Sequence, residues 1–478
     1  MVATVASLQP PLCVDLDGTL IRSDLLLETL LILIKRNPLF LFKALLWLVQ
    51  GKAVLKAQIA ARVAVNPAAL PYDKRLVDWL ERQRRSGREV WLCTAANEKL
   101  AKSVSTYLGL FTGVVASDGR ANLAGHRKAE RLVGLFGERG FDYCGNEWRD
   151  LAIWQHARGA VVVNGSSALE REVRSQGNAL QIFSCEGSRL KPFVRALRPH
   201  QWAKNVLVLA PMLAAHRALE PAVLLGCLLA FIAFSLCASS VYVLNDMLDL
   251  EADRGHPRKS NRPFASGDLP LAAGFVMFPA LLLVGGIVAA FLPFKFQLSL
   301  LAYYAVTVAY SSFLKRFLLI DAVSLAGLYT LRIIAGAGAA EVPLSFWLLL
   351  LSVFLFLSLA FVKRYAELDL LRRQQRLQAL GRGYRVEDLA VLQSFGTASG
   401  YLSVLVLALY INSPDVQALY HHPKFIWTLC VLILYWISRV WMTAHRGGMH
   451  DDPVVYALRD RVSLGIGVVA AIAIALAI

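Results

Sequence analysis

The composition of this chain excludes an ordinary soluble protein. Its 478 residues are 56% hydrophobic and only 18% charged, whereas soluble globular chains carry about 25% charged residues, and the mean hydropathy is +0.51. The 50 Lys and Arg against 34 Asp and Glu give a formal net charge of +16. In so apolar a chain we expect these cations to face anionic lipid or phosphorylated molecules, and not nucleic acid.

Two further features of the sequence limit the class of protein. The 7 cysteines are scattered without a CxxC pair, so we expect neither a zinc site nor a disulfide framework. Residues 1–12 lack a basic segment followed by an apolar one, so we expect no cleavable signal peptide. The sequence does not indicate an oligomeric state.

Hydropathy predicts two domains, residues 1–189 and 190–478. In the first, short apolar strands at 12–16, 89–93 and 160–163 alternate with helical stretches, which is typical of an α/β fold. The second is predicted to be an all-α membrane domain, because its apolar runs reach the length that a bilayer requires. Nine spans are expected, at 204–216, 221–244, 272–292, 296–313, 318–337, 343–362, 392–411, 424–443 and 462–478.

Loop charges predict the orientation of these spans. With the N-terminus inside, the inside loops carry most of the Lys and Arg, and the outside loops carry only Arg217, Lys295 and Lys424. The positive-inside rule therefore predicts a multi-pass inner-membrane protein whose N-terminal domain is cytoplasmic.

An acidic motif follows the second predicted span. Residues 245–253 read NDMLDLEAD, and Asp246, Asp249 and Asp253 stand at i, i+3 and i+7, which is one face of a continuing helix. Three neighbouring carboxylates repel each other unless a cation joins them, and oxygen ligands suit Mg²⁺. The cations that follow, Arg258, Lys259 and Arg262, suit phosphate oxygens. The alternative is a solvated acidic helix end followed by topology-setting cations.

This segment resembles the NDxxDxxxD signature of the UbiA-type intramembrane prenyltransferases, which have nine transmembrane helices. Four further stretches, RPHQWAKN (198–205), YSSFLK (310–315), KRYAEL (363–368) and DDPVVYALRDR (451–461), are similar to the decaprenyl-phosphate phosphoribosyltransferase branch. The resemblance implies transfer of 5-phosphoribose from phosphoribosyl diphosphate to a polyprenyl phosphate, with Mg²⁺ held by the three aspartates.

The second loop supports that branch. Prenyltransferases of the superfamily carry a second motif, DxxxD, after the sixth span, but here the loop reads KRYAELDLLRRQQR and keeps only Glu367 and Asp369 among many cations. A basic loop suits additional phosphates, although its cations could also only set topology. The residues expected to bind substrate are Lys204, Asn245, Arg258, Lys259, Arg262, Tyr310, Lys315, Arg332, Lys363, Arg364, Tyr365 and Glu367.

Two of these expectations have a particular physical basis. Arg332 lies inside a predicted span, where an unpaired cation is costly, so we expect it to face a central cavity. Tyr310 and Tyr365 are expected to orient ribose or phosphate, but they also fit an interfacial tyrosine belt.

The N-terminal half resembles the haloacid-dehalogenase-like (HAD) phosphatases. CVDLDGTL at 13–20 places Asp15 and Asp17 after an apolar strand, Thr94 and Lys128 follow in the expected order, and a helical insertion at about 24–86 stands where that family has its cap. The resemblance implies that Asp15 attacks phosphorus, Asp17 acts as general acid and base, and Thr94 and Lys128 bind the phosphoryl group.

The HAD resemblance also implies a Mg²⁺ held by Asp15, the main chain of Asp17, and Asp150. The family's GDxxxD reads GNEWRD here, and Asn146 in place of an aspartate leaves open whether the domain is an active phosphatase or a degenerate regulatory one. The cap contains two unusually apolar runs, 25–34 and 39–49, which fit either a cap core or a surface resting on the bilayer.

Three functions fit the whole sequence. The first is the phosphoribosyl transfer, with a linked dephosphorylation of the lipid product. The second is a prenyl diphosphate transferase acting on an aromatic acceptor, which requires a second carboxylate cluster. The third is a transporter or lipid-binding membrane protein that uses the acidic triplet as an ion site.

Overall fold

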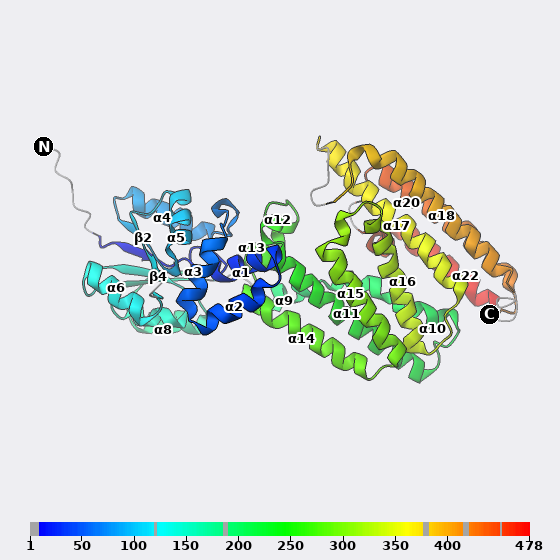
Figure 1. Ribbon diagram of the computed structural model, residues 1–478, viewed down its shortest axis with the longest axis horizontal. Helices are drawn as coiled ribbons and strands as arrows, with labels where there is room; N and C mark the ends of the chain where they lie inside the picture. The colour runs from blue at the N-terminus through cyan, green and yellow to red at the C-terminus, as the bar shows by residue number, and fades with distance from the viewer. Residues whose placement is uncertain (1–8, 119–121, 185–189, 376–381, 414–419, 450–451) are drawn as a thin grey trace. The chain divides into compact units, whose positions relative to one another are not determined.

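The computed structural model describes residues 9–118, 122–184, 190–375, 382–413, 420–449 and 452–478 (Figure 1). The chain divides into two compact units. The first contains Met1–Ala196 and Val243–Met277, and the second contains Leu197–Tyr242 and Phe278–Ile478. The segment 243–277, which includes the acidic motif, therefore folds with the N-terminal half.

A six-stranded parallel sheet forms the centre of the first unit. The strand order is β3-β2-β1-β4-β5-β6, and β1 pairs with β2 on one side and with β4 on the other. The strands are β1 (Leu12–Val14), β2 (Val90–Asn97), β3 (Gly113–Ser117), β4 (Asp142–Gly145), β5 (Gly159–Val163) and β6 (Ala179–Phe183). The predicted α/β fold is confirmed, and the three strands expected from the sequence are present.

Side chains alternate between the two faces of this sheet. Leu12 and Val14 pack in one cluster with residues of α4 (Lys74–Arg85) and α5 (Glu98–Leu108), whereas Cys13 packs in another with α6 (His126–Phe136) and α8 (Ser167–Ser175). Figure 1 shows these helix pairs on opposite sides of the sheet. The sheet is thus buried on both faces, which explains its continuous apolar strands.

Three helices form the insertion between β1 and β2. They are α1 (Leu25–Arg36), α2 (Phe40–Val49) and α3 (Lys52–Arg62). Helix α1 begins where the Asp24 carboxylate accepts a hydrogen bond from the Leu27 amide at 3.0 Å, and it ends before Pro38. A small core that includes Leu33, Ala44 and Ile59 joins the three helices.

The other elements of the first unit are short. They are η1 (Pro67–Ala69), η2 (Trp148–Asp150), α7 (Leu151–Trp154), α9 (Leu190–Leu197) at the boundary, and, after the acidic motif, α12 (Leu250–Arg254), η4 (Lys259–Asn261) and α13 (Pro263–Ser266).

The second unit is helical. Its elements are η3 (Pro199–Leu209), α10 (Ala210–Ala214), α11 (Pro221–Leu248), α14 (Leu271–Ala290), α15 (Phe294–Ser312), η5 (Leu314–Arg316), α16 (Ile320–Ala340), α17 (Phe346–Arg373), η6 (Val386–Asp388), α18 (Leu389–Ile411), η7 (Pro423–Ile426), α20 (Trp427–His445), α21 (Pro453–Ala457) and α22 (Arg461–Ala477). Both α11 and α14 continue into the segment that folds with the first unit.

The predicted number of nine spans is not confirmed: within the described residues, six helices are long and apolar enough to cross a membrane. The region 204–216 forms the short elements η3 and α10, and α22 has only 17 residues. Helix α15 carries Lys295, Gln297 and three tyrosines, which make it too polar to meet the same criterion.

Close contact between η3 and α16 positions several polar side chains. A Cβ at Gly336 of α16 would lie 2.0 Å from the carbonyl oxygen of Val208, so only glycine allows η3 to approach this helix. As a result, Lys204 and Asn205 of η3 lie against the polar residues of α16.

We predict that Asp142 stabilises the first unit. Its carboxylate is fully buried and binds Arg88 and Arg158, the latter at 2.6 Å. Replacing it in Asp142→Ala leaves the buried Arg88 guanidinium without its acid, and loss of one partner of a buried pair typically costs about 3–5 kcal/mol. The melting temperature of the N-terminal unit should therefore fall by several degrees, as measured by calorimetry of the full chain.

Glu81→Gln is the matched control for Asp142→Ala. It removes an exposed pair with Arg85 at 3.4 Å, and such pairs contribute roughly 0.5 kcal/mol or less. Equal effects of the two variants would contradict the prediction.

Candidate functional site

The acidic motif does not continue as one helix. Helix α11 ends at Leu248, and Asp249 has φ −108° and ψ 19°, which lies outside the helical region. The expectation that the three aspartates share the face of a continuous helix is therefore wrong. Asp249 pairs with a different cation from the one that binds the other two carboxylates.

Asp246 and Asp253 converge on one cation. The Arg262 Nη1 atom lies 3.0 Å from Asp246 Oδ1 and 2.6 Å from Asp253 Oδ2. Both carboxylates are almost fully buried, whereas Arg262 is about a quarter exposed. Two buried carboxylates so close together need a positive charge between them, and here the guanidinium supplies it.

Asp249 binds a lysine of the cap helix α1. Lys35 Nζ lies 2.6 Å from Asp249 Oδ1 and also donates to the Leu248 carbonyl at 2.9 Å. The other residues expected in this segment differ in exposure: Arg258 and Lys259 are exposed, and Asn245 is half-buried.

The acidic motif fits a magnesium ion by its chemistry. Among the described residues, no group of three or more His, Cys, Asp or Glu side chains is arranged to hold a metal ion. However, Asp246 and Asp253 already place two carboxylate oxygens around a single cationic centre. Oxygen donors of this kind are those that Mg²⁺ prefers.

A second charged group surrounds Asp452 in the second unit. Lys204 Nζ and Lys363 Nζ each lie 2.8 Å from Asp452 Oδ2, and the Tyr329 hydroxyl donates to Oδ1 at 2.9 Å. Burial alone would raise the pKa of Asp452, but Lys363 and Lys204 hold this pKa well below its usual range. The three charged side chains together carry a net positive charge.

Arg332 lies in a neighbouring buried group. Its guanidinium donates to Asn205 Oδ1 at 2.9 Å and to the Tyr303 hydroxyl at 3.0 Å. It also stacks over the rings of Tyr303 and Tyr329, 4.7 and 5.4 Å from their centroids. The charge of this arginine inside an apolar helix is therefore stabilised by uncharged polar and aromatic partners, and only 4% of it is exposed.

A third group joins α15, α16 and α17. The buried Arg364 binds Asp321 and Glu367, each at 2.5 Å, and donates to the Tyr310 hydroxyl at 3.0 Å. Tyr310 in turn donates to Asp321 at 2.8 Å. Arg382 Nη1 lies 3.0 Å from Glu367 and 3.9 Å from Asp321.

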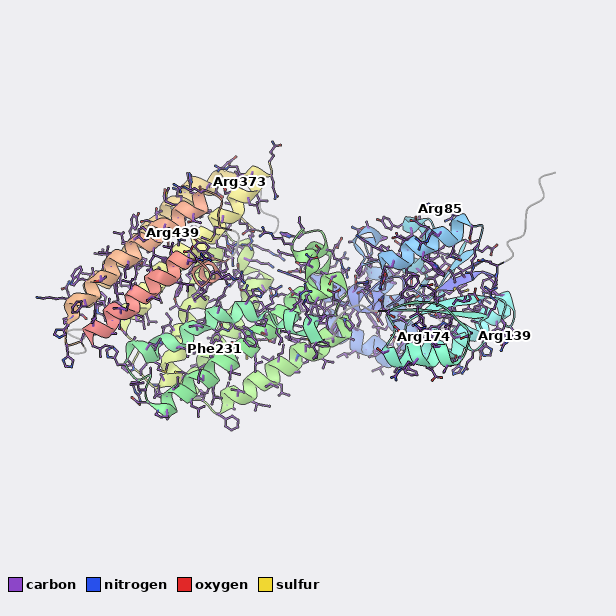
Figure 2. All side chains as sticks on the ribbon, turned by 180° about the vertical axis from the view of Figure 1, so that it is seen from behind. Arg85, Arg139, Arg174, Phe231, Arg373 and Arg439 are labelled. Carbon is purple, nitrogen blue, oxygen red and sulfur yellow. The ribbon has the colours of Figure 1, made fainter. Side chains whose placement is uncertain are left out.

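The second-loop residues have different partners. Asp369 is bound by Arg372 and by Arg373, which Figure 2 labels on α17, at 2.5 and 2.8 Å. Tyr365 lies apart from the Asp321 group, because its hydroxyl is 2.9 Å from His445 Nδ1. Lys315 is half-buried in the short helix η5.

The sequence motifs of the N-terminal half also meet in space. Lys128 Nζ lies 2.9 Å from Asp15 Oδ1 and donates to the Tyr143 hydroxyl at 2.8 Å, and Tyr143 donates to Asp150 at 3.3 Å. Burial alone would lower the pKa of Lys128, but Asp15 and Asp150 raise it. Burial and the charge of Asp15 raise the pKa of Asp150 to about 6.

Asn146 packs against the loop that follows β1. Its Oδ1 accepts a hydrogen bond from Thr19 at 3.2 Å, and a Cβ at Gly18, where φ is +73°, would lie 2.2 Å from its Nδ2. Asp17 is fixed nearby by the Leu25 amide at 2.9 Å, and burial, with the charges of Asp24 and Asp15, raises its pKa. The Thr94 hydroxyl accepts from the Ala96 amide at 3.0 Å.

Sequence analysis did not assign roles to Asp452, Asp321, Asn205, Tyr303 or Tyr329. Two signals were available: Asp452 and Asn205 lie in the quoted motifs DDPVVYALRDR and RPHQWAKN. Asp321 stands at the start of an apolar helix, where a buried carboxylate predicts a cationic partner.

The comparison with family models decides the classification of this chain. The model of the UbiA prenyltransferase family matches residues 206–458. The chain belongs to this family. It is therefore a multi-pass membrane transferase with an additional N-terminal α/β unit.

Three known proteins illustrate what this chain is similar to. Protein y4nM of Sinorhizobium fredii is 37% identical over 98% of this chain and 91% of its own length, so the similarity covers both units. Decaprenyl-phosphate phosphoribosyltransferase of Mycobacterium tuberculosis is 35% identical over 56% of this chain and 88% of its own. A solved UbiA homologue from Archaeoglobus fulgidus, bound to DMAPP and Mg²⁺, is 17% identical with a TM-score of 0.46, covering 60% of this chain and 97% of that one.

We predict that Arg364 is required for stability of the membrane unit. Arg364→Met leaves the buried Asp321 with Arg382, at 3.9 Å, as its remaining ion-pair partner among the described residues, and breaking such a pair typically costs about 3–5 kcal/mol. The thermal midpoint of the purified protein in detergent should fall clearly, as followed by aggregation on heating.

Arg372→Met is the matched control for Arg364→Met. Asp369 keeps its second partner, Arg373, at 2.8 Å, so this variant should melt close to the wild type. A control that loses as much stability as Arg364→Met would contradict the prediction.

Proposed function

We propose that this UbiA-family protein transfers 5-phosphoribose from phosphoribosyl diphosphate to a polyprenyl phosphate. The observation that carries the proposal is the charge of the second loop and its neighbours. Glu367 and Asp369 are both bound to arginines, while Lys204 and Lys363 share one carboxylate, Asp452. In these groups the lysines and arginines therefore outnumber the carboxylates.

This charge balance suits the proposed substrates better than a prenyl diphosphate. An aromatic prenyltransferase of the superfamily needs a second carboxylate cluster for metal, and carboxylates already neutralised by arginine serve that purpose poorly. A phosphoribosyl donor and a lipid phosphate instead bring two additional phosphates, which lysine and arginine bind by charge-assisted hydrogen bonds. The name of the mycobacterial relative supports the same substrates.

In the proposed reaction, an oxygen of the lipid phosphate attacks the anomeric carbon of ribose, and the bond from that carbon to the diphosphate breaks. The nucleophile is already anionic, so no strong base is required. When bound, Mg²⁺ would stabilise the negative charge on the departing diphosphate. Asp246, Asp253 and Asp249 would hold it.

The chain's own cations orient the phosphates in this proposal. Phosphate contacts are assigned to Lys204, Arg258, Lys259, Arg262, Lys315, Lys363 and Arg364. Tyr310 is assigned to the ribose or a phosphate oxygen, since its hydroxyl is held between Arg364 and Asp321. Tyr365 is assigned to the same role, and its hydroxyl lies 2.9 Å from His445 Nδ1.

We also propose nine spans, an inner-membrane location, and domains of 1–189 and 190–478 with the first in the cytoplasm. The loop charges support this topology.

We predict that the purified full chain, given Mg²⁺, a polyprenyl phosphate and phosphoribosyl diphosphate, forms a lipid that has gained ribose 5-phosphate. Asp246→Asn should lower the turnover rate by about 100-fold or more, because charge stabilisation at the leaving group is lost. The lipid product is followed by mass spectrometry.

Asp268→Asn is the control for Asp246→Asn. This carboxylate lies in the same segment but outside the acidic motif, and it is 3.9 Å from Arg22. It should keep full activity. Turnover of a prenyl diphosphate with an aromatic acid, and none with phosphoribosyl diphosphate, would overturn the proposal in favour of the quinone-type reaction. Absence of both activities in the wild-type protein would favour a non-enzymatic membrane protein, and full activity of Asp246→Asn would overturn the role assigned to this carboxylate.

We propose a second activity for the first unit: removal of the 5-phosphate from the lipid product. The supporting observation is the chain of contacts from Lys128 to Asp15 and through Tyr143 to Asp150. Asp15 would attack phosphorus and Asp17 would protonate the departing oxygen and then activate water. A Mg²⁺ held by Asp15, Asp150 and the main chain of Asp17 would neutralise the phosphoryl group.

We predict that Asn146→Asp increases this phosphatase rate by about tenfold, because a carboxylate next to a metal site strengthens metal binding. Asp15→Asn should leave the 5-phosphate on the lipid. Asn97→Asp is the control, since Asn97 caps α5 and aspartate caps a helix equally well. The second activity would be overturned if the wild-type protein left the 5-phosphate on the lipid while a competent HAD phosphatase removed it.

A further inference from the structure

Helix α2 of the cap exposes an apolar surface. Its ten residues read FLFKALLWLV, and only Ala44 among them is buried. Phe42 is 65% exposed and Val49 is 88% exposed. The exposed apolar residues of this surface are Leu39, Leu41, Phe42, Leu45, Leu46, Leu48 and Val49. A helix that is apolar on nearly all sides is normally covered, yet the described residues of the first unit do not cover this one.

The charges around α2 are all positive. From Arg36 to Lys52 the sequence contains no Asp or Glu. Arg36, Lys43 and Lys52 are exposed, and Lys43 Nζ lies 5.1 Å from the centroid of the Phe40 ring. A short apolar helix with a rim of cations is typical of segments that lie in the boundary between lipid headgroups and acyl chains.

The end of α1 contacts the last residue of a candidate membrane span. Lys35 donates to the carbonyl oxygen of Leu248 at 2.9 Å, and Leu248 is the last residue of the candidate span α11. A buried pair within the same unit, Arg254 with Glu28 at 2.7 Å, holds α1 against the segment that follows this span. Helix α2 begins only five residues after Lys35, a distance of at most about 18 Å along an extended chain.

The length of α2 excludes a further span. Ten helical residues are about 15 Å long, which is half of the roughly 30 Å hydrocarbon core. We propose that α2 lies within the surface of the membrane that α11 spans, with Phe42, Leu46 and Val49 among the acyl chains. Lys43 and Lys52 face anionic headgroups. This role is independent of both proposed activities.

Spin labelling of the full chain tests the proposal. A nitroxide is attached at Leu46→Cys, and at Arg85→Cys as the water-exposed control on α4, labelled in Figure 2. The background is Cys185→Ser, because all other cysteines are buried. The protein is placed one copy per nanodisc in phosphatidylcholine, with or without phosphatidylglycerol, and collisions with oxygen and with a water-soluble nickel chelate are measured.

We expect the ratio of oxygen to nickel accessibility to be about tenfold higher at position 46 than at position 85, since oxygen concentrates in lipid and the chelate is excluded. Phosphatidylglycerol should deepen the label, and Lys43→Gln with Lys52→Gln should abolish this lipid dependence. Equal nickel accessibility at the two positions would overturn the proposal. So would exclusion of both reagents from position 46, because protein and not lipid would then cover α2.

Discussion

Several carboxylates buried in this apolar chain are each held by a cation, and this pairing organises the polar parts of both units. Asp142, Asp321, Asp452 and Glu28 are each almost completely removed from water, and each is held by at least one lysine or arginine. Isolated ions in such surroundings are prohibitively costly. The helices are therefore placed where their charged residues can meet.

The numbers of positive and negative side chains are not equal in these groups. Around Asp452 two lysines share one carboxylate, whereas around Arg262 two carboxylates share one guanidinium. Lysines that share one carboxylate suit anions. In the proposed reaction the phosphate oxygens would use these lysines, and Mg²⁺ would use the carboxylates.

Much of this organisation could be read from the sequence, but not all of it. Short apolar runs between helical stretches predicted β1, β2 and β5, and the acidic and basic motifs identified residues such as Asp246, Lys204 and Arg364 that lie in the charged groups. Spacing could not show that the helix breaks at Asp249, because Leu-Asp-Leu has no Gly or Pro to signal it. It also could not pair Asp321 with Arg364, since such long-range partners depend on tertiary packing.

The division of the chain into units has a consequence for the UbiA family signature. The mycobacterial relative aligns over 273 residues that make up 88% of its length, which leaves no room for an N-terminal unit of the size found here. In this chain, by contrast, Glu28 and Lys35 of the cap bind Arg254 and Asp249 of the signature segment. The cap thus supplies two of the charges that neutralise this segment. Because removal of one partner from a buried pair strongly destabilises the other, the buried pair of Glu28 with Arg254 makes the fold of this segment depend on the cap.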